Sequence, residues 1–186
     1  MSASGGARVA SRTRTGLVGP ILAGAAVVVA LGAYAGLHDP AGRALDLAGF
    51  SSPGAVKSWL STAALALVVV QVVTAAGMWG RLGATAPRWS APVHRWSGRL
   101  ALLAMVPVAV HCLYAFGFGY DSPRVLVHSL AGCFFFGAFT TKMLGLTRSG
   151  LPGWALPLLG GLVTAGLVLL WLTSALWFFT TFGFAR

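Results

Sequence analysis

The chain contains very few charged residues, and this scarcity excludes several classes of protein. Only 9% of its 186 residues are charged and 57% are hydrophobic, so there is too little polar surface to cover a soluble globular domain. The three acidic residues, Asp39, Asp46 and Asp121, all fall outside the long hydrophobic runs. An ion or proton transporter driven by carboxylates within the membrane is therefore not expected.

The sequence motifs of soluble catalysis are also missing. The chain has no Walker loop, no dinucleotide-binding glycine motif and no nucleophile elbow. Its two cysteines, Cys112 and Cys133, have no CxxC or HxxH spacing around them, so a zinc site is not expected. We interpret them as small buried hydrophobic residues, and a disulfide between them stays open. The net charge of +10 comes from basic residues dispersed at the ends of the hydrophobic runs, a pattern that does not indicate nucleic-acid binding.

Five long hydrophobic runs remain, and they predict an all-α integral membrane bundle. The predicted transmembrane helices cover about residues 16–37, 60–80, 96–118, 125–146 and 155–182. These runs are continuous rather than alternating, which excludes a membrane β-barrel. A single domain of residues 16–186 is expected to hold all five spans, and the first span is expected to stay uncleaved. Residues 1–15 are expected to form a disordered basic cytoplasmic tail.

The basic residues predict the orientation of the bundle. With the N-terminus in the cytoplasm, nine of them lie on the inner side and four on the outer side, as the positive-inside rule requires. We therefore predict a multi-pass protein of the cell (plasma) membrane, with its N-terminus in the cytoplasm and its C-terminus outside. The inner residues, which would also contact anionic lipid headgroups, are Arg8, Arg12, Arg14, Arg81, Arg88, Arg95, Arg99, Lys142 and Arg148, and the outer ones are Arg43, Lys57, Arg124 and Arg186.

Two of the four histidines lie well inside predicted spans, where ionisable side chains are costly and indicate functional sites. His111 comes late in the third span and His128 early in the fourth, so both lie at a similar depth near the outer face. Paired imidazoles in a helical bundle suit a b-type haem, and we predict that this pair binds haem b iron. Gly132 would let the porphyrin approach the helix closely. Arg124 and Tyr114 each lie one turn from a histidine and are placed to meet the propionates.

Alternatives stay open for these residues. The histidine pair would also suit a structural hydrogen bond between helices, or a proton or metal site. Packed helices lie about 8–10 Å apart, so the third and fourth spans would have to diverge to admit a haem. His94 is a candidate for a second site but has no identifiable partner, and contact with lipid phosphate is the other interpretation. His38 is interpreted as a loop residue, and Gln71, Thr140 and Thr141 as hydrogen-bonding between helices.

Several stretches resemble known families. The sequence HRWSGR from His94, the histidine deeper in that helix and the one in the next helix resemble small membrane b-type cytochromes of the cytochrome b561-like and ferric-reductase-like group. The stretches VLVHSLAGCFFFGAFTTKMLGL and LPGWALPLLGG also resemble a family of uncharacterised actinobacterial membrane proteins. Together these matches cover a little under half of the chain. The first resemblance implies one or two haems that pass electrons across or within the membrane; the second implies no known activity.

Two functional hypotheses follow. The first is a membrane electron-transfer protein, at most an oxidoreductase component, with one haem near the outer face. Two-haem cytochromes of the group carry four intramembrane histidines, and this chain has two deep ones, which limits the prediction to one well-supported haem. Since the chain carries no soluble catalytic module, electrons would come from a quinol or a redox partner protein. The second hypothesis is a cofactor-free bundle that acts as an anchor, an assembly factor or an interaction partner.

Overall fold

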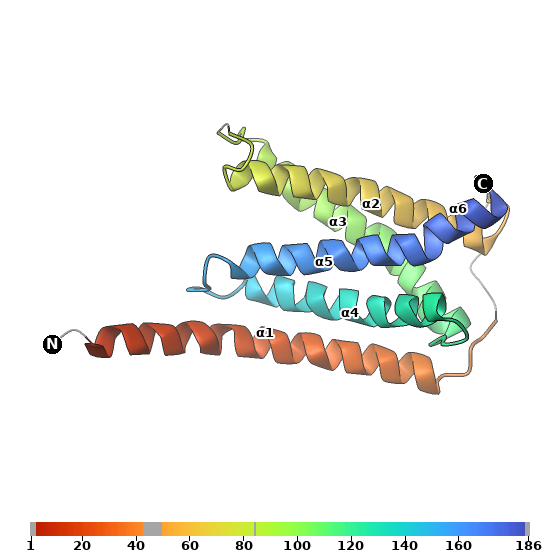
Figure 1. Cartoon of the computed structure of the whole chain (residues 1–186), viewed down its shortest axis with the longest axis horizontal. Coiled ribbons are helices and arrows are strands. Elements are labelled where there is room, and N and C mark those ends of the chain that lie inside the picture. The colour runs from red at the N-terminus through yellow and green to blue at the C-terminus, as the bar shows by residue number, and fades with distance from the viewer. Residues whose placement is uncertain (1–2, 43–49, 84, 185–186) are drawn as a thin grey trace. The chain divides into compact units, whose positions relative to one another are not determined.

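The computed structural model describes residues 3–42, 50–83 and 85–184, and over these residues the chain is helical without any strand (Figure 1). Five segments are long and apolar enough to cross a membrane, namely 16–37, 53–78, 90–116, 123–145 and 155–182. The predicted all-α class with five candidate spans is thereby confirmed. The helices, in chain order, are α1 (Ala3–Leu37), α2 (Pro53–Met78), α3 (Ser90–His111), the π-helix η1 (Cys112–Phe116), α4 (Pro123–Gly145), α5 (Ala155–Trp171), the π-helix η2 (Leu172–Leu176) and α6 (Trp177–Phe182).

Helices α2 and α3 start earlier than their predicted spans, and in α2 a local capping signal sets the start of the helix before hydrophobicity rises. Ser52 is the N-cap of α2, and its hydroxyl oxygen accepts a hydrogen bond from the backbone N–H of Ala55 at 3.2 Å. Pro53 follows in the first helical position, where its missing N–H costs nothing. Helix α3 begins at Ser90, with Pro92 in its opening turn as predicted. Both helices therefore extend beyond their most apolar part.

Helix α1 begins at Ala3 and so runs through the segment for which a disordered tail was predicted. The three alanines and three arginines of that segment favour a helix, whereas its two glycines disfavour one. Arg43 and Arg186, which entered the orientation argument, lie outside the described residues, as does Asp46.

The chain divides into two compact units, and each is described by itself. The first comprises Met1–His38 and Phe118–Leu169, and the second comprises Asp39–Gly117 and Leu170–Arg186. This division groups residues by their contacts, so the predicted single domain of residues 16–186 stays a prediction.

In the first unit, α1 lies along α4, and the two backbones meet at a pair of glycines (Figure 1). A Cβ added to Gly24 would lie 2.5 Å from the carbonyl oxygen of Gly137. A Cβ added to Gly137 would in turn lie 2.7 Å from the carbonyl oxygen of Gly24. Only glycine fits at both positions, as at other close crossings of membrane helices. The prediction that Thr140 and Thr141 bond between helices is wrong for the part of the chain that the structure describes. Each hydroxyl donates instead to a carbonyl of its own helix α4, at 2.8 and 2.9 Å.

In the second unit, α2 packs along α3, while η2 and α6 pack against α2. The indole N–H of Trp171 donates a hydrogen bond of 2.9 Å to the hydroxyl oxygen of Thr62. Near the start of α2, the ring of Trp59 meets Phe179 edge-on, with 5.3 Å between ring centroids. Apolar contacts and the hydrogen bond of Trp171 therefore help to hold the last helical segments on α2.

Candidate functional site

His111 is the last residue of α3, and its imidazole is buried. Only 4% of the residue is exposed. Its Nε2 atom has no hydrogen-bond partner among the residues that the structure describes. A buried polar atom without a partner typically costs about 1–3 kcal/mol, so its presence calls for an explanation. A bound ligand that accepts or shares the nitrogen lone pair is one such explanation.

The π-helix η1 starts immediately after His111 and brings Phe116 back to it. In an α-helix, a residue five positions further on lies about 140° around the axis. The wider π-helix, which closes i→i+5 hydrogen bonds, returns that residue toward the same face. The ring centroids of His111 and Phe116 are accordingly 5.3 Å apart, with 38° between the ring planes. Short π segments of this kind are frequent at functional sites.

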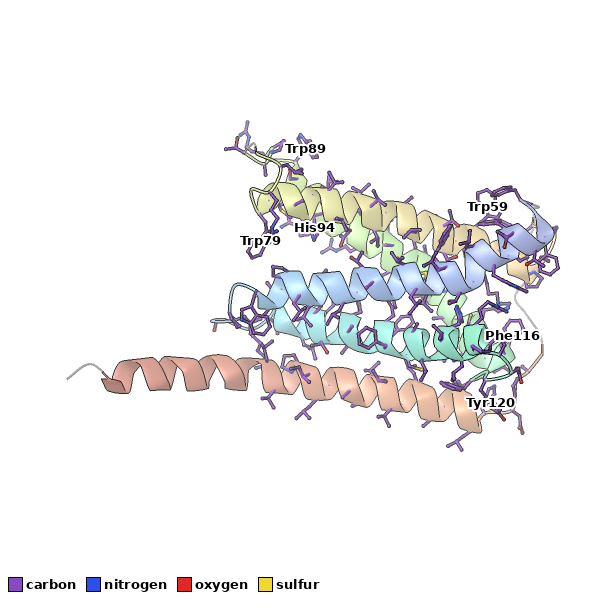
Figure 2. The ribbon with its side chains drawn as sticks, viewed as in Figure 1. Trp59, Trp79, Trp89, His94, Phe116 and Tyr120 are labelled. Atoms are coloured by element: carbon purple, nitrogen blue, oxygen red, sulfur yellow. The ribbon has the colours of Figure 1, made fainter. Side chains whose placement is uncertain are left out.

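Lys57, from the first turns of α2, completes this group of side chains. Its Nζ atom lies 4.2 Å from the centroid of the Phe116 ring, in cation–π geometry, and the residue is half-buried. From the sequence alone, Lys57 is expected only to be one of the outer-side charges. No local signal could have connected it with His111, because the two residues come from different helices. Figure 2 shows Phe116 and Trp59 toward one end of this unit, and Trp79, Trp89 and His94 toward the other.

Backbone hydrogen bonds from the loop after α1 hold η1, the segment that follows α3. Tyr114 is half-exposed on η1, and its carbonyl accepts a hydrogen bond of 3.1 Å from the N–H of Ala41. The carbonyl of Ala115 accepts a similar bond of 3.2 Å from Gly42. Residues of the loop after α1 thus satisfy carbonyls that the end of a helix leaves without partners. Cys112, the first residue of η1, is a free thiol.

The remaining predicted site residues lie in the first unit, on α4. His128 lies in the second turn of this helix, and Arg124 is in its first turn. Gly132 follows His128 by one turn, and all three residues are half-buried. Since His111 belongs to the second unit and His128 to the first, their pairing stays a prediction. Cys133, buried on α4, is a free thiol as well.

His94, the candidate for a second site, is held by polar groups of α2. Its Nδ1 atom lies 3.1 Å from the carbonyl oxygen of Gln71 and 3.1 Å from the hydroxyl oxygen of Thr74. The amide nitrogen of Gln71 donates to the carbonyl oxygen of His94, and more weakly to the hydroxyl of Ser97 at 3.4 Å. The prediction that Gln71 bonds between helices is confirmed. A carbonyl that fixes one imidazole nitrogen is an arrangement found in structural and in metal-binding histidines alike.

The site can hold a metal only if most of the ligands come from elsewhere. No group of three or more histidine, cysteine or acidic side chains that could hold a metal ion occurs among residues 3–42, 50–83 and 85–184. Haem iron is already held by four porphyrin nitrogens and takes only its axial ligands from the protein. A single buried imidazole whose Nε2 has no partner among the described residues is the type of ligand that haem takes, whereas a bare ion takes several protein ligands.

Comparisons with known proteins identify a family and no activity. No curated protein and no solved structure matches the chain. A protein-family model described as a family of unknown function matches residues 17–186, which is nearly the whole length of the chain. The chain therefore belongs to that family, DUF6529.

Proposed function

We propose that this protein is a multi-pass electron-transfer protein of the cell membrane that binds haem b through His111 and His128. The observation that carries the proposal is the buried Nε2 atom of His111, which has no partner among the described residues. A neutral imidazole nitrogen in this condition is the type of atom that haem iron takes as an axial ligand. With the N-terminus in the cytoplasm, as the distribution of basic residues favours, the haem would lie near the outer face.

His128 is proposed as the second ligand because of its depth in its own span. His111 comes five residues before the end of the span 90–116, and His128 comes five residues after the start of the span 123–145. At a rise of 1.5 Å per residue, each histidine is about 7–8 Å from the adjacent end of its helix. Two ligands of one haem must lie at similar depth in the membrane. The equal distance of His111 and His128 from the ends of their spans supports this pairing.

The chain's own residues would bind and orient the cofactor. Haem b supplies an iron that accepts and releases one electron at a time. His111 and His128 would each present a neutral nitrogen to it, and each imidazole would carry its proton on the other nitrogen. Phe116 would keep water from one side of His111. Electrons would arrive from a quinol in the bilayer or from a redox partner protein.

The test is a reduced-minus-oxidised visible spectrum of protein purified in detergent after expression with ample haem. The wild type is expected to show sharp α and β bands of a b-type haem. His111→Ala and His128→Ala are each expected to lose these bands while the protein still inserts and purifies in normal amounts.

His38→Ala is the matched control, because His38 lies at the end of α1 with its ring stacked on Tyr34 at 5.0 Å. This variant is expected to keep the full spectrum. A colourless wild type that is folded and monodisperse would overturn the proposal. It would favour a cofactor-free bundle that acts as an anchor, an assembly factor or an interaction partner.

A further inference from the structure

The position of Lys57 is unusual for a cation. Helix α2 starts at Pro53, so Lys57 lies just beyond its first turn, near the positive end of the helix dipole. The helix dipole disfavours a cation most strongly within the first turn, so its effect on Lys57 is small. Lys57 itself is half-buried, and its ammonium lies over the ring of Phe116. A half-buried ammonium is stabilised by a counter-charge.

The described residues do not supply that counter-charge. Within residues 3–42, 50–83 and 85–184, no carboxylate forms an ion pair with Lys57. Its ammonium instead contacts the ring of Phe116. An ammonium has three N–H donors, and one aromatic face engages only one side of it. Donors therefore remain available for an anionic oxygen that approaches from the other side.

The same ring connects Lys57 to the buried histidine. Phe116 has the Lys57 ammonium 4.2 Å from its centroid and the imidazole of His111 at 5.3 Å, centroid to centroid. All three side chains belong to the second unit and to the end of it where α2 begins and α3 ends. A ligand on the Nε2 atom of His111 would have the ammonium of Lys57 one aromatic ring away.

We propose that Lys57 binds a carboxylate of the ligand that His111 takes, an inference that rests on the proposed function. For haem b, that carboxylate is a propionate. The residues for which sequence analysis predicted this role were Arg124 and Tyr114. Lys57 is the cation that the second unit itself places next to His111.

The test compares haem with haem dimethyl ester, whose propionates are esterified and carry no charge. Haem-free protein in one detergent is titrated with each compound, for the wild type, Lys57→Gln and the matched control Lys142→Gln. Lys142 is the other half-buried lysine inside a span, and it lies on α4. Lys57→Gln is expected to weaken the binding of haem about fivefold, the size of a partly exposed ion pair. It is expected to leave the binding of the ester unchanged, and Lys142→Gln is expected to change neither.

The outcomes separate the two proposals. If Lys57→Gln binds haem as tightly as the wild type, or loses the same affinity for haem and for the ester, the carboxylate site is wrong while haem binding stands. If the wild type binds neither compound, the proposed function falls, and the carboxylate site falls with it.

Discussion

Helix α3 carries two histidines at its two ends, and they differ in what the protein provides for them. The imidazole of His94 has Nδ1 within 3.1 Å of a carbonyl and of a hydroxyl, both from α2. The imidazole of His111 is more deeply buried, yet its Nε2 atom has no partner among the described residues. His94 is hydrogen-bonded within the interface between α2 and α3. The buried Nε2 atom of His111 has no hydrogen-bond partner among the described residues.

This difference distinguishes a structural histidine from a candidate ligand. A polar residue that stabilises a helix interface uses its hydrogen-bonding atoms in that interface. A buried polar atom that stays unsatisfied costs stability, and a ligand from outside the polypeptide is one explanation for such an atom. Hydrophobicity and spacing could not reveal this, because both residues are histidines of the same helix.

The sharpest test of the contrast is the haem content of His94→Ala. This variant is expected to keep all the haem of the wild type, whereas His111→Ala loses it, so the two ends of α3 should differ in an all-or-none manner. Haem per protein is measured by the pyridine haemochrome method. A His94→Ala protein with about half the normal haem would show that the first turn of α3 also holds a cofactor, and would abolish the contrast.

Leucine substitutions of His94 and His111 in the haem-free protein compare the contributions of the two histidines to the free energy of unfolding. His94→Leu is expected to lower the free energy of unfolding by about 1–2 kcal/mol, because it leaves groups of α2 without their partner. His111→Leu is expected to leave that free energy unchanged or to raise it by about 1 kcal/mol, because it removes an unsatisfied atom. Unfolding in mixed micelles with increasing SDS gives both values. Equal losses in the two variants would mean that His111 is also a structural residue.

The smallest effect is expected at Gly98, which faces Gln71. A Cβ there would meet the amide nitrogen of Gln71 and lie 3.1 Å from its Cδ, so the flexible side chain would have to leave the carbonyl of His94. Gly98→Ala is expected to be less stable than the control Gly36→Ala by about 0.5–1 kcal/mol, the worth of one interhelical hydrogen bond. Gly36 is a suitable control because a Cβ there has no atom within 4 Å among the described residues. Equal stability of the two variants would mean that Gln71 does not support His94.

Much of the fold could be predicted from the sequence, because each span is an apolar run long enough to cross a bilayer. The start of α2 was predicted late, since Lys57 and Ser58 lower the hydrophobicity of a segment that Ser52 and Pro53 nevertheless start as a helix. Ser52 and Pro53 are a capping signal for α2, but hydrophobicity alone predicts a start closer to residue 60.

The candidate site was predictable only in part. The depth of His111 identified it as a candidate, and Gln71 was correctly expected to bond between helices. The contact between His111 and Phe116 could not be foreseen, because a single π-helical turn leaves no trace in the hydrophobic pattern. The contact of Lys57 with that ring joins residues far apart in the chain, which no local pattern encodes.

The close contact of α1 and α4 at Gly24 and Gly137 has a consequence for the synthesis of the protein. Helix α2 meets its partner α3 as soon as the next segment is made, but Gly24 leaves the ribosome long before Gly137 exists. At ordinary rates of translation, α1 waits about ten seconds for the helix it will pack against. During that time α1 is not yet packed against α4, and the absence of any charged residue between Gly16 and Leu37 would let it stay in a bilayer until α4 is made.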